Sequence, residues 1–470
     1  MPSQSSSDSQ LPSTPPEASR VLVRAARAAL RPIDRFLHIE AASGIVLLVV
    51  AAGALVWANS PWHESYTAFW HTQLGFAVSG FSFSRSLQWV VNDGLMVIFF
   101  FVVGMEIRRE VHHGELSEWR RAAIPVLAAL GGMLVPAALY LALAGAPATR
   151  DGWGVPMATD IAFALGVLTL LGNRVPPALR VLLLAVAVID DLGAIIVIAL
   201  FYSESFALGG LLIAAGGFGT ILLMQAFGVR AKLAYVPPAV VAWAGVYITG
   251  VHPTIAGVLV GVLTPVRTWL GTEGFITGVR SQLVELSAPE AQGMSNHDWA
   301  ESLRRIDLLR REAMSPAERL IQMLHPWVAF GIMPAFALAN AGVRMTGDHA
   351  FNATVMTAVA LGLIMGKPIG VFCAAWLAVR SGVGALPRGI GNRHLLVLGI
   401  VAGVGFTMAL FIAQLAFRDE ALLASGKLGI LCASAIAGLA ALGLGRWLLP
   451  ANLPGGYAQT AHEAEASSVL

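Results

Sequence analysis

The feature that most constrains this chain is a series of apolar stretches, each close to the length that crosses a lipid bilayer. A helix needs about 20 residues to span the hydrocarbon core, and stretches near that length follow one another along most of the sequence. Their predicted positions are 41–59, 87–107, 121–144, 155–172, 178–201, 207–228, 233–250, 253–266, 325–343, 354–379, 393–417 and 426–449. The pattern predicts an all-α polytopic membrane protein with about twelve transmembrane helices, the seventh and eighth of them short.

The composition agrees with this class and excludes others. Hydrophobic residues make up 56% of the 470 residues and charged residues 12%, whereas soluble domains average about 45–50% and about 25%. The formal net charge is only +2, so no nucleic-acid partner is expected. Cys373 and Cys432 lie within apolar stretches, so we predict no disulfide framework and no metal cluster. No cofactor is expected.

The distribution of basic residues predicts the orientation in the membrane. Arginines gather after the second, fourth, sixth, eighth and tenth stretches and are sparse in the alternate loops. Cytoplasmic loops carry the excess of Lys and Arg. We therefore expect both termini to be cytoplasmic.

Segments outside the spans divide the rest of the chain. Residues 1–19 are rich in Ser and Pro and are predicted to be a disordered cytoplasmic tail, and 450–470 a second tail. Residues 20–449 form a single membrane domain. Within it, 75–84 alternate apolar and small residues, which predicts a β-hairpin outside the membrane. The charged segment 267–319 is predicted to be a partly helical cytoplasmic insertion.

Four ionisable residues lie inside predicted spans, where charges are rare and mark functional sites. They are Asp160, Asp190, Asp191 and Lys367. Asp160 alone could cap a half-helix, and Lys367 alone could form a structural ion pair. Adjacent aspartates point about 100° apart on a helix, so Asp190 and Asp191 need separate partners.

Two of these spans carry helix-breaking residues. Pro156 precedes Thr159 and Asp160 in the fourth stretch, and Gly403 and Gly405 precede Thr407 in the eleventh. Discontinuous helices in corresponding halves of a chain mark the midplane ion site of secondary transporters. Close packing through small residues is the alternative explanation.

The chemistry of these residues suits a small cation. Na+ prefers oxygen ligands such as carboxylates, hydroxyls and unwound carbonyls. Protons compete for the same carboxylates, so loading one expels the other. Two other classes remain open: a sodium-coupled organic-solute symporter, and an intramembrane aspartyl protease with Asp160 and Asp191 as its dyad.

These segments resemble the NhaA-type sodium/proton antiporter family over roughly residues 38–448. The matching segments are Val103-Gly-Met-Glu-Ile-Arg-Arg-Glu110, Ala158-Thr-Asp-Ile-Ala-Phe-Ala-Leu-Gly166, Ile189-Asp-Asp-Leu192, Gly250-Val-His-Pro-Thr-Ile-Ala-Gly257, His325-Pro-Trp327, Gly366-Lys-Pro368 and Gly403-Val-Gly-Phe-Thr-Met408.

The resemblance implies both a fold and an activity. The expected fold has twelve spans, inverted repeats of spans 3–5 and 10–12, and discontinuous, crossed spans four and eleven. The expected protein is a homodimer joined through the 75–84 hairpin, in the bacterial inner membrane. It would not be an enzyme but an electrogenic antiporter that exports Na+ and Li+ in exchange for H+ and is activated at alkaline pH.

The resemblance also implies roles for individual residues. Asp160 and Asp191 would bind Na+ with Thr159 beside them, and Asp190 would pair with Lys367. Charge on Asp160 and Lys367 would offset the ends of the broken helices. A pH-responsive set at the cytoplasmic mouth would comprise Glu106, Arg109, Glu110, His252 and His325.

The chain departs from the family pattern just before its Leu-His-Pro-Trp segment. Ile321 and Gln322 stand where the family type has an acidic residue and a histidine. Neither side chain titrates, so we expect a shallower or shifted pH response.

Overall fold

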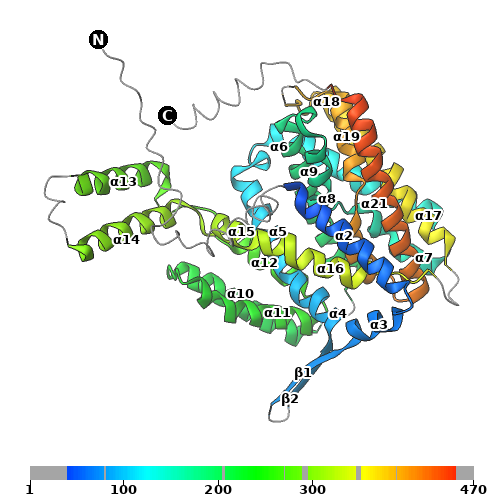
Figure 1. Ribbon diagram of the computed structural model, residues 1–470, viewed down its shortest axis with the longest axis horizontal. Helices are drawn as coiled ribbons and strands as arrows, with labels where there is room; N and C mark the ends of the chain where they lie inside the picture. Colours follow the sequence, from blue (N-terminus) through cyan, green and yellow to red (C-terminus); the bar gives the residue numbers. More distant parts are fainter. Residues whose placement is uncertain are drawn as a thin grey trace, which may run out of the picture.

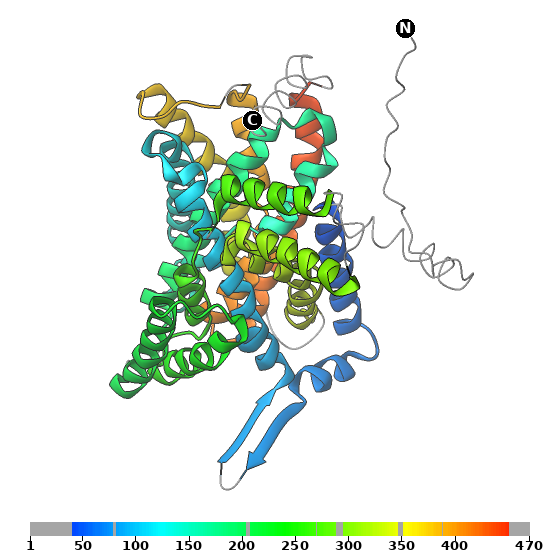
Figure 2. The same ribbon diagram turned by 90° about the vertical axis from the view of Figure 1, so that its left-hand side faces the viewer.

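The computed structural model describes residues 40–450, except 79–80, 204–206, 269, 288–294, 346–350 and 388. The predicted tail 1–19 and all but the first residue of 450–470 lie outside these ranges. Most described residues belong to helices, which form one bundle with a β-hairpin at one end and a helical pair projecting from its side (Figures 1 and 2).

The elements of the first half are α2 (Glu40–Ala58), α3 (His63–His71), β1 (Gln73–Val78), β2 (Phe81–Ser86), α4 (Leu87–Trp89), η2 (Val90–Leu95), α5 (Met96–His113), η3 (Glu115–Ser117), α6 (Trp119–Leu143), α7 (Pro147–Arg150), η4 (Asp151–Met157), α8 (Ile161–Leu170), η5 (Gly172–Arg174), α9 (Pro177–Phe201), α10 (Leu208–Ala226), η6 (Lys232–Tyr235), α11 (Val236–Thr249) and α12 (Thr254–Leu263).

The elements of the second half are α13 (Gly271–Ser287), α14 (Asn296–Ala313), α15 (Pro316–Trp327), η8 (Val328–Ile332), α16 (Met333–Asn340), α17 (Ala353–Leu361), η9 (Gly362–Gly366), α18 (Lys367–Arg380), α19 (Asn392–Ala402), α20 (Phe406–Ala416) and α21 (Glu420–Leu448).

Among the described residues, seven helices are long and apolar enough to cross a membrane. Three further pairs of helices, each bent at a short break, raise the count to ten if each pair is one span. Helices α11 and α12, with 14 and 10 residues, fall below that length. The structure therefore supports a polytopic helical membrane protein, while the predicted count of twelve depends on these two short helices.

Three of the long helices contain a π-helical turn. These turns are η2, which continues α4 into α5, η8, which joins α15 to α16, and η9, which joins α17 to α18. Such turns occur frequently at functional sites. η9 ends directly before Lys367, and η2 contains Asn92 and Asp93.

Glycine lets the long helices approach closely. A Cβ atom on Gly370 of α18 would lie 2.1 Å from the carbonyl oxygen of Gly131 on α6. A Cβ on Gly104 of α5 would lie 2.4 Å from the carbonyl oxygen of Val258 on α12. No larger side chain fits at these crossings, so the helix pairs pack backbone against backbone, as membrane helices commonly do.

The predicted β-hairpin is present and is longer than 75–84. β1 and β2 pair antiparallel from Gln73↔Ser86 to Val78↔Phe81. Its base is fixed to α11, because Arg85 Nη2 donates to Tyr247 Oη at 2.6 Å. The same guanidinium lies 5.7 Å from the ring centroid of Trp89 on α4. We call the end of the molecule that carries β1, β2 and α4 the hairpin end.

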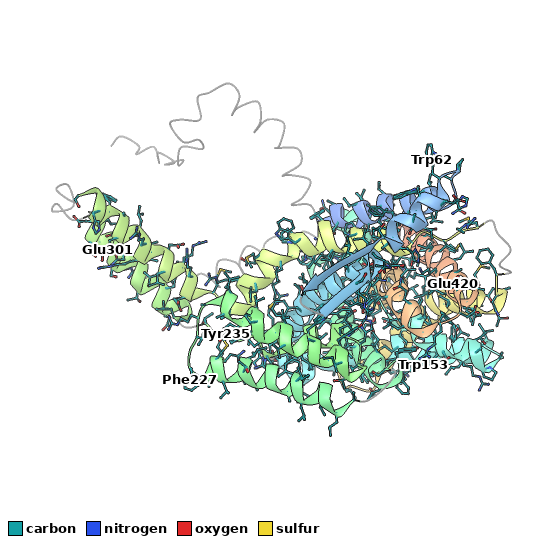
Figure 3. All side chains as sticks on the ribbon, turned by 90° about the horizontal axis from the view of Figure 1, so that it is seen from below. Trp62, Trp153, Phe227, Tyr235, Glu301 and Glu420 are labelled. Atoms are coloured by element: carbon teal, nitrogen blue, oxygen red, sulfur yellow. The ribbon has the colours of Figure 1, made fainter. Side chains whose placement is uncertain are left out.

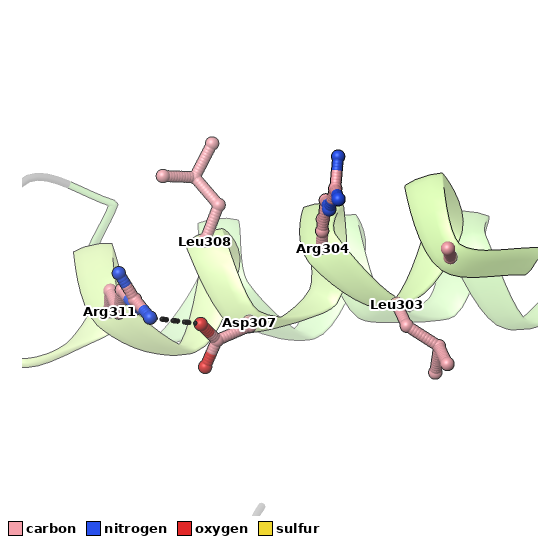
Figure 4. Close-up of a pocket in the computed structure, with 6 residues that line it drawn as sticks. Leu303, Arg304, Asp307, Leu308 and Arg311 are labelled. Carbon is pink, nitrogen blue, oxygen red and sulfur yellow. Dashed lines mark ion pairs between the residues drawn. The ribbon is translucent and has the colours of Figure 1, made fainter. Parts of the chain in front are cut away.

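The charged insertion at 267–319 is largely helical, as expected. α13 and α14 form a pair that projects from the bundle (Figure 1). Glu301 on α14 lies far from the other labelled residues (Figure 3). α14 carries a shallow groove beside Leu303 and Leu308, where Arg311 Nη2 lies 2.6 Å from Asp307 Oδ2 (Figure 4). A hydrogen bond from Arg310 and the charge of Arg311 hold the pKa of Asp307 below its usual value.

Candidate cation site

Two broken helices meet at their breaks in the interior of the bundle. η4 and α8 are bent by 48° around residues 158–160, and α19 and α20 by 48° around 403–405. The backbone N–H of Asp160 donates to the Val404 carbonyl at 2.8 Å, which joins one break to the other. A Cβ at Gly403 would lie 2.6 Å from the Leu363 carbonyl oxygen, so glycine is required for this approach.

Asp160 lies where two helices begin. Its side chain is fully buried. Oδ1 accepts from the Phe163 N–H of α8 at 3.0 Å, and Oδ2 accepts from the Thr407 N–H of α20 at 3.1 Å and from the Thr407 hydroxyl. One carboxylate therefore faces the positive ends of both α8 and α20. Asp160 therefore caps the N-terminus of α8, as one interpretation of the sequence predicted. Its carboxylate also lies at the positive end of α20, where a negative charge offsets the helix dipole.

Lys367 occupies the opposite position, where a helix ends. Its Nζ lies 2.8 Å from Asp190 Oδ2 and donates to the carbonyl of Met157, the last residue of η4. Both side chains of the ion pair are fully buried. The expected pairing of Asp190 with Lys367 is confirmed, and the ammonium faces a carbonyl at the negative end of a helix.

Thr159 connects the ion pair to the second break. Its hydroxyl oxygen lies 2.8 Å from Asp190 Oδ2 and 3.1 Å from the carbonyl oxygen of Ala402, the last residue of α19. Pro156, the predicted breaking residue of the fourth stretch, packs beside η9, where a Cβ on Gly362 would lie 2.7 Å from the Pro156 ring.

Asp191 differs from the other two aspartates. It is fully buried, and neither carboxylate oxygen has a hydrogen-bond partner among the residues that the structure describes. Asp190, Glu106, Lys367 and Asp160 all interact with it electrostatically. A buried carboxylate without hydrogen bonds is costly unless it takes up a proton or a cation. Its oxygens are therefore available ligands.

Three residues of the predicted pH-responsive set share α5, near the end opposite the hairpin. Arg109 Nη1 lies 3.9 Å from Glu318 Oε1 of α15. Glu110 Oε1 accepts from the backbone N–H of Glu115 at 2.7 Å. Glu106 interacts electrostatically with Arg109 and with Asp191, which links this cluster to the aspartate site.

α15 carries the two positions where the chain departs from the family pattern. Ile321 is buried and Gln322 is exposed, one turn after Glu318. His325, a predicted member of the pH-responsive set, lies one turn further along α15. Sequence reasoning missed Glu318, the residue that pairs with Arg109, although its acidic side chain begins the apolar helix.

The structure does not bring His252 together with the rest of the pH-responsive set. Its Nε2 lies 3.3 Å from Asp93 Oδ1, and its Nδ1 lies 2.7 Å from Thr254 Oγ1. Asp93 lies near the hairpin end of the helix that carries Glu106, about 20 Å away at 1.5 Å per residue. His252 lies in the connection between α11 and α12 and pairs with Asp93, so it belongs to the hairpin end.

Sequence reasoning also missed a group of carboxamide side chains near Asp93. Asn92, Asn340 and Gln414 come from η2, α16 and α20 and are joined by hydrogen bonds. The available signal was the presence of hydrogen-bonding side chains within apolar spans, where they need partners from other helices.

Comparison with known proteins gives one consistent result. The sequence model of the family described as Na+/H+ antiporter 1 matches residues 34–444. A Na+/H+ antiporter NhaA 2 of Myxococcus xanthus is 66% identical over 97% of this chain and 97% of its own length. Proteins of the same description from Sorangium cellulosum and Pseudomonas putida are 52% and 48% identical, over 98% and 90% of this chain and 99% and 94% of their own lengths. The chain therefore belongs to the NhaA family of Na+/H+ antiporters.

Proposed function

We propose that this protein exports Na+, and also Li+, in exchange for H+, and that the exchange is electrogenic and increases at alkaline pH. The observation that carries the proposal is the buried carboxylate of Asp191, whose oxygens have no hydrogen-bond partner among the described residues, beside the crossing of two broken helices. Family membership places the chain among transporters, which removes the protease alternative.

Exchange follows from competition for shared oxygens. Asp191 and Asp160 bind Na+ with help from backbone carbonyls at the breaks, and protons occupy the same carboxylates when Na+ leaves. An organic-solute symporter is disfavoured, because four buried charges around one crossing suit a bare cation. The site then alternates between a sodium-loaded and a proton-loaded form.

The net charges of the sodium-loaded and proton-loaded forms make this exchange electrogenic. Lys367 neutralises Asp190, which leaves Asp160 and Asp191 as two uncompensated carboxylates. With one Na+ bound, the site has a net charge of about −1. With two protons bound, the site is neutral. The two loaded forms differ by one charge, so each cycle moves charge across the membrane. Lys367 as the proton carrier is the alternative assignment.

The finer architecture completes the proposal. α11 and α12 are the two short spans that bring the number to twelve, and α6–α9 and α17–α21 are the inverted repeats. The protein lies in the bacterial inner membrane with both termini and α13–α14 in the cytoplasm. The β-hairpin lies in the periplasm, where it joins two copies into a homodimer.

The activity is tested in proteoliposomes that contain a pH-sensitive dye. Vesicles loaded with Na+ and diluted into sodium-free buffer should acidify inside, with Li+ acting likewise and choline giving no signal. An inside-negative potential, set with K+ and valinomycin, should accelerate acidification. Acidification that required an added organic solute, or that ignored the potential, would contradict the proposal.

A further inference from the structure

Three carboxamide side chains form a closed ring of hydrogen bonds between three elements. Asn92 Nδ2 donates to Gln414 Oε1 at 2.7 Å, Gln414 Nε2 donates to Asn340 Oδ1, and Asn340 Nδ2 donates to Asn92 Oδ1 at 2.8 Å. Asn340 is fully buried, while Asn92 and Gln414 are partly buried. Asn340 is the centre of the ring, because its Oδ1 also accepts from Gln88 at 3.3 Å and its Nδ2 also donates to the Phe336 carbonyl at 2.9 Å. Gln414 is joined to the other two members by two hydrogen bonds, and losing it removes both.

The ring lies at the hairpin end of the candidate cation site. Asn92 is in the first turns of the helix that begins directly after β2, and Gln414 is in the last turn of α20. Thr407, at the beginning of α20, contacts Asp160. The 407 and 414 positions lie on one face of α20, about 10 Å apart along its axis.

Aromatic side chains fill the space between these two positions. Phe411 lies on the same face of α20, and its ring centroid is 5.2 Å from that of Phe100 and 6.1 Å from that of Phe336. All three rings are at most 1% exposed. Between the carboxamide ring and Thr407, α20 therefore passes through a closely packed layer of aromatic rings, with the His252 ring at its edge, 5.2 Å from Phe411.

An exchanger needs such a layer, because a continuous water path through the site would let ions leak. We infer that the ring of Asn92, Asn340 and Gln414, with the Phe100, Phe336 and Phe411 layer, is the gate that closes the cation site toward the hairpin end. Gln414 is its positioning residue, since it is the member of the ring that belongs to a broken helix. This inference rests on the proposed function.

Side-specific cysteine labelling tests the gate without requiring transport. In a background with Cys373→Ser and Cys432→Ser, Thr407→Cys places a thiol behind the aromatic layer. A membrane-impermeant methanethiosulfonate reagent added from the hairpin side should label it slowly. Adding Gln414→Leu, which removes two hydrogen bonds of the ring, should increase that rate about tenfold. The rate from the opposite side should not rise.

A matched control separates gating from general loosening. Gln225 of α10 donates one hydrogen bond to the Leu263 carbonyl at 3.0 Å, away from the ring, so Gln225→Leu should leave the labelling rate unchanged. The gate would be refuted if Thr407→Cys were labelled at the same rate with and without Gln414→Leu. An equal rise in the labelling rate with Gln225→Leu would also refute it. Because labelling is read without exchange, a protein that failed to transport Na+ would still report on it.

A second pair of substitutions covers the case in which Gln414→Leu does not fold. Asn92→Cys with Gln414→Cys, bridged by a short bis-methanethiosulfonate reagent, should hold the gate shut and arrest exchange. Reduction should restore exchange. Either single cysteine, in which the ring is already broken, should exchange at the same rate before and after treatment with the reagent, and continued exchange by the bridged protein would refute the inference.

Discussion

At the scale of single residues, the candidate site separates three aspartates that look alike in the sequence. Asp190 is paired with Lys367 at 2.8 Å, and Asp160 accepts hydrogen bonds from two helix N-termini. Asp191 has no hydrogen-bond partner among the described residues. Neutralising each aspartate should therefore have a different effect on stability and on transport.

Asp191→Asn should abolish exchange while the protein still folds. The amide keeps the shape of the side chain but carries neither the exchanged proton nor the charge that attracts Na+. Removing an unpaired buried charge should leave the melting temperature unchanged or raised. Dye-loaded proteoliposomes measure exchange, and thermal unfolding in detergent measures stability. Near-normal exchange would remove Asp191 from the mechanism.

Lys367→Ala should destabilise the protein by about 3–5 kcal/mol, because it leaves Asp190 buried and unpaired. The double variant Asp190→Asn with Lys367→Met should recover most of that loss. If Lys367 is only the partner of Asp190, sodium-driven current on a solid-supported membrane should persist in the double variant. An electroneutral double variant would instead identify Lys367 as the proton carrier.

At the scale of elements, the site exists because two helices stop and restart where they cross. The breaks at 158–160 and 403–405 expose helix ends inside the bundle, and polar side chains then occupy those ends. Glycine at 403 is what lets the second break pass the η9 backbone. The spacing of the two breaks is therefore sensitive to a single methyl group.

Gly403→Ala should weaken Na+ binding and cost about 1–3 kcal/mol of stability, because its Cβ would lie 2.6 Å from the Leu363 carbonyl oxygen. Gly216→Ala of α10 is the matched control, since a Cβ there meets no atom within 4 Å. We expect that control to be neutral or slightly stabilising. The apparent KM for Na+ and the melting temperature provide the measurements, and equal behaviour of the two variants would contradict this account.

At the scale of the whole molecule, the hairpin and the α13–α14 pair distinguish the two ends of the bundle (Figures 1 and 2). α4 follows β2 of the hairpin directly and contacts the carboxamide ring, because Gln88 Nε2 donates to Asn340 Oδ1 at 3.3 Å. α13–α14 precedes α15, whose Glu318 pairs with Arg109. The basic residues of the insertion predict that it lies in the cytoplasm, as in the proposed topology. The orientation in the membrane thus determines which side the gate of Asn92, Asn340 and Gln414 faces.

Cysteine labelling in intact cells should separate these two sides. Without native cysteines, Ser84→Cys on β2 should react with an impermeant maleimide, and Glu301→Cys on α14 should react only after the membrane is opened. Both positions are exposed, so access rather than burial decides the outcome. Labelling of Glu301→Cys in intact cells would reverse the proposed topology.

The pH response should follow competition between Na+ and protons at one site. Raising Na+ tenfold should shift the pH of half-maximal exchange toward acid, by about half a unit if two protons leave per Na+ and about one unit if one leaves. Stopped-flow exchange at several Na+ concentrations measures this shift. A midpoint independent of Na+ would assign the response to a remote sensor such as the Arg109 and Glu318 cluster.

The sequence by itself determined the membrane class, the apolar segments, the β-hairpin and the identity of the charged residues inside the spans. Each depends on local composition: the length of an apolar stretch, an alternating pattern, or a charge where charges are costly. Which carboxylate keeps its oxygens unpartnered was not decided by the residues alone. Asp190 and Asp191 are equivalent as neighbours on one helix, and only the resemblance to a family favoured Asp190 as the partner of Lys367.

Only the tertiary structure decided which distant side chains meet. It placed Thr407 on Asp160, Glu318 beside Arg109, His252 at the hairpin end, and Gln414 in a ring with Asn92 and Asn340. Most of these pairs join helices far apart in the chain, and their contacts depend on how breaks, π-helical turns and glycine crossings set the packing. A side chain's direction across a helix interface is fixed by that packing, which no local pattern encodes.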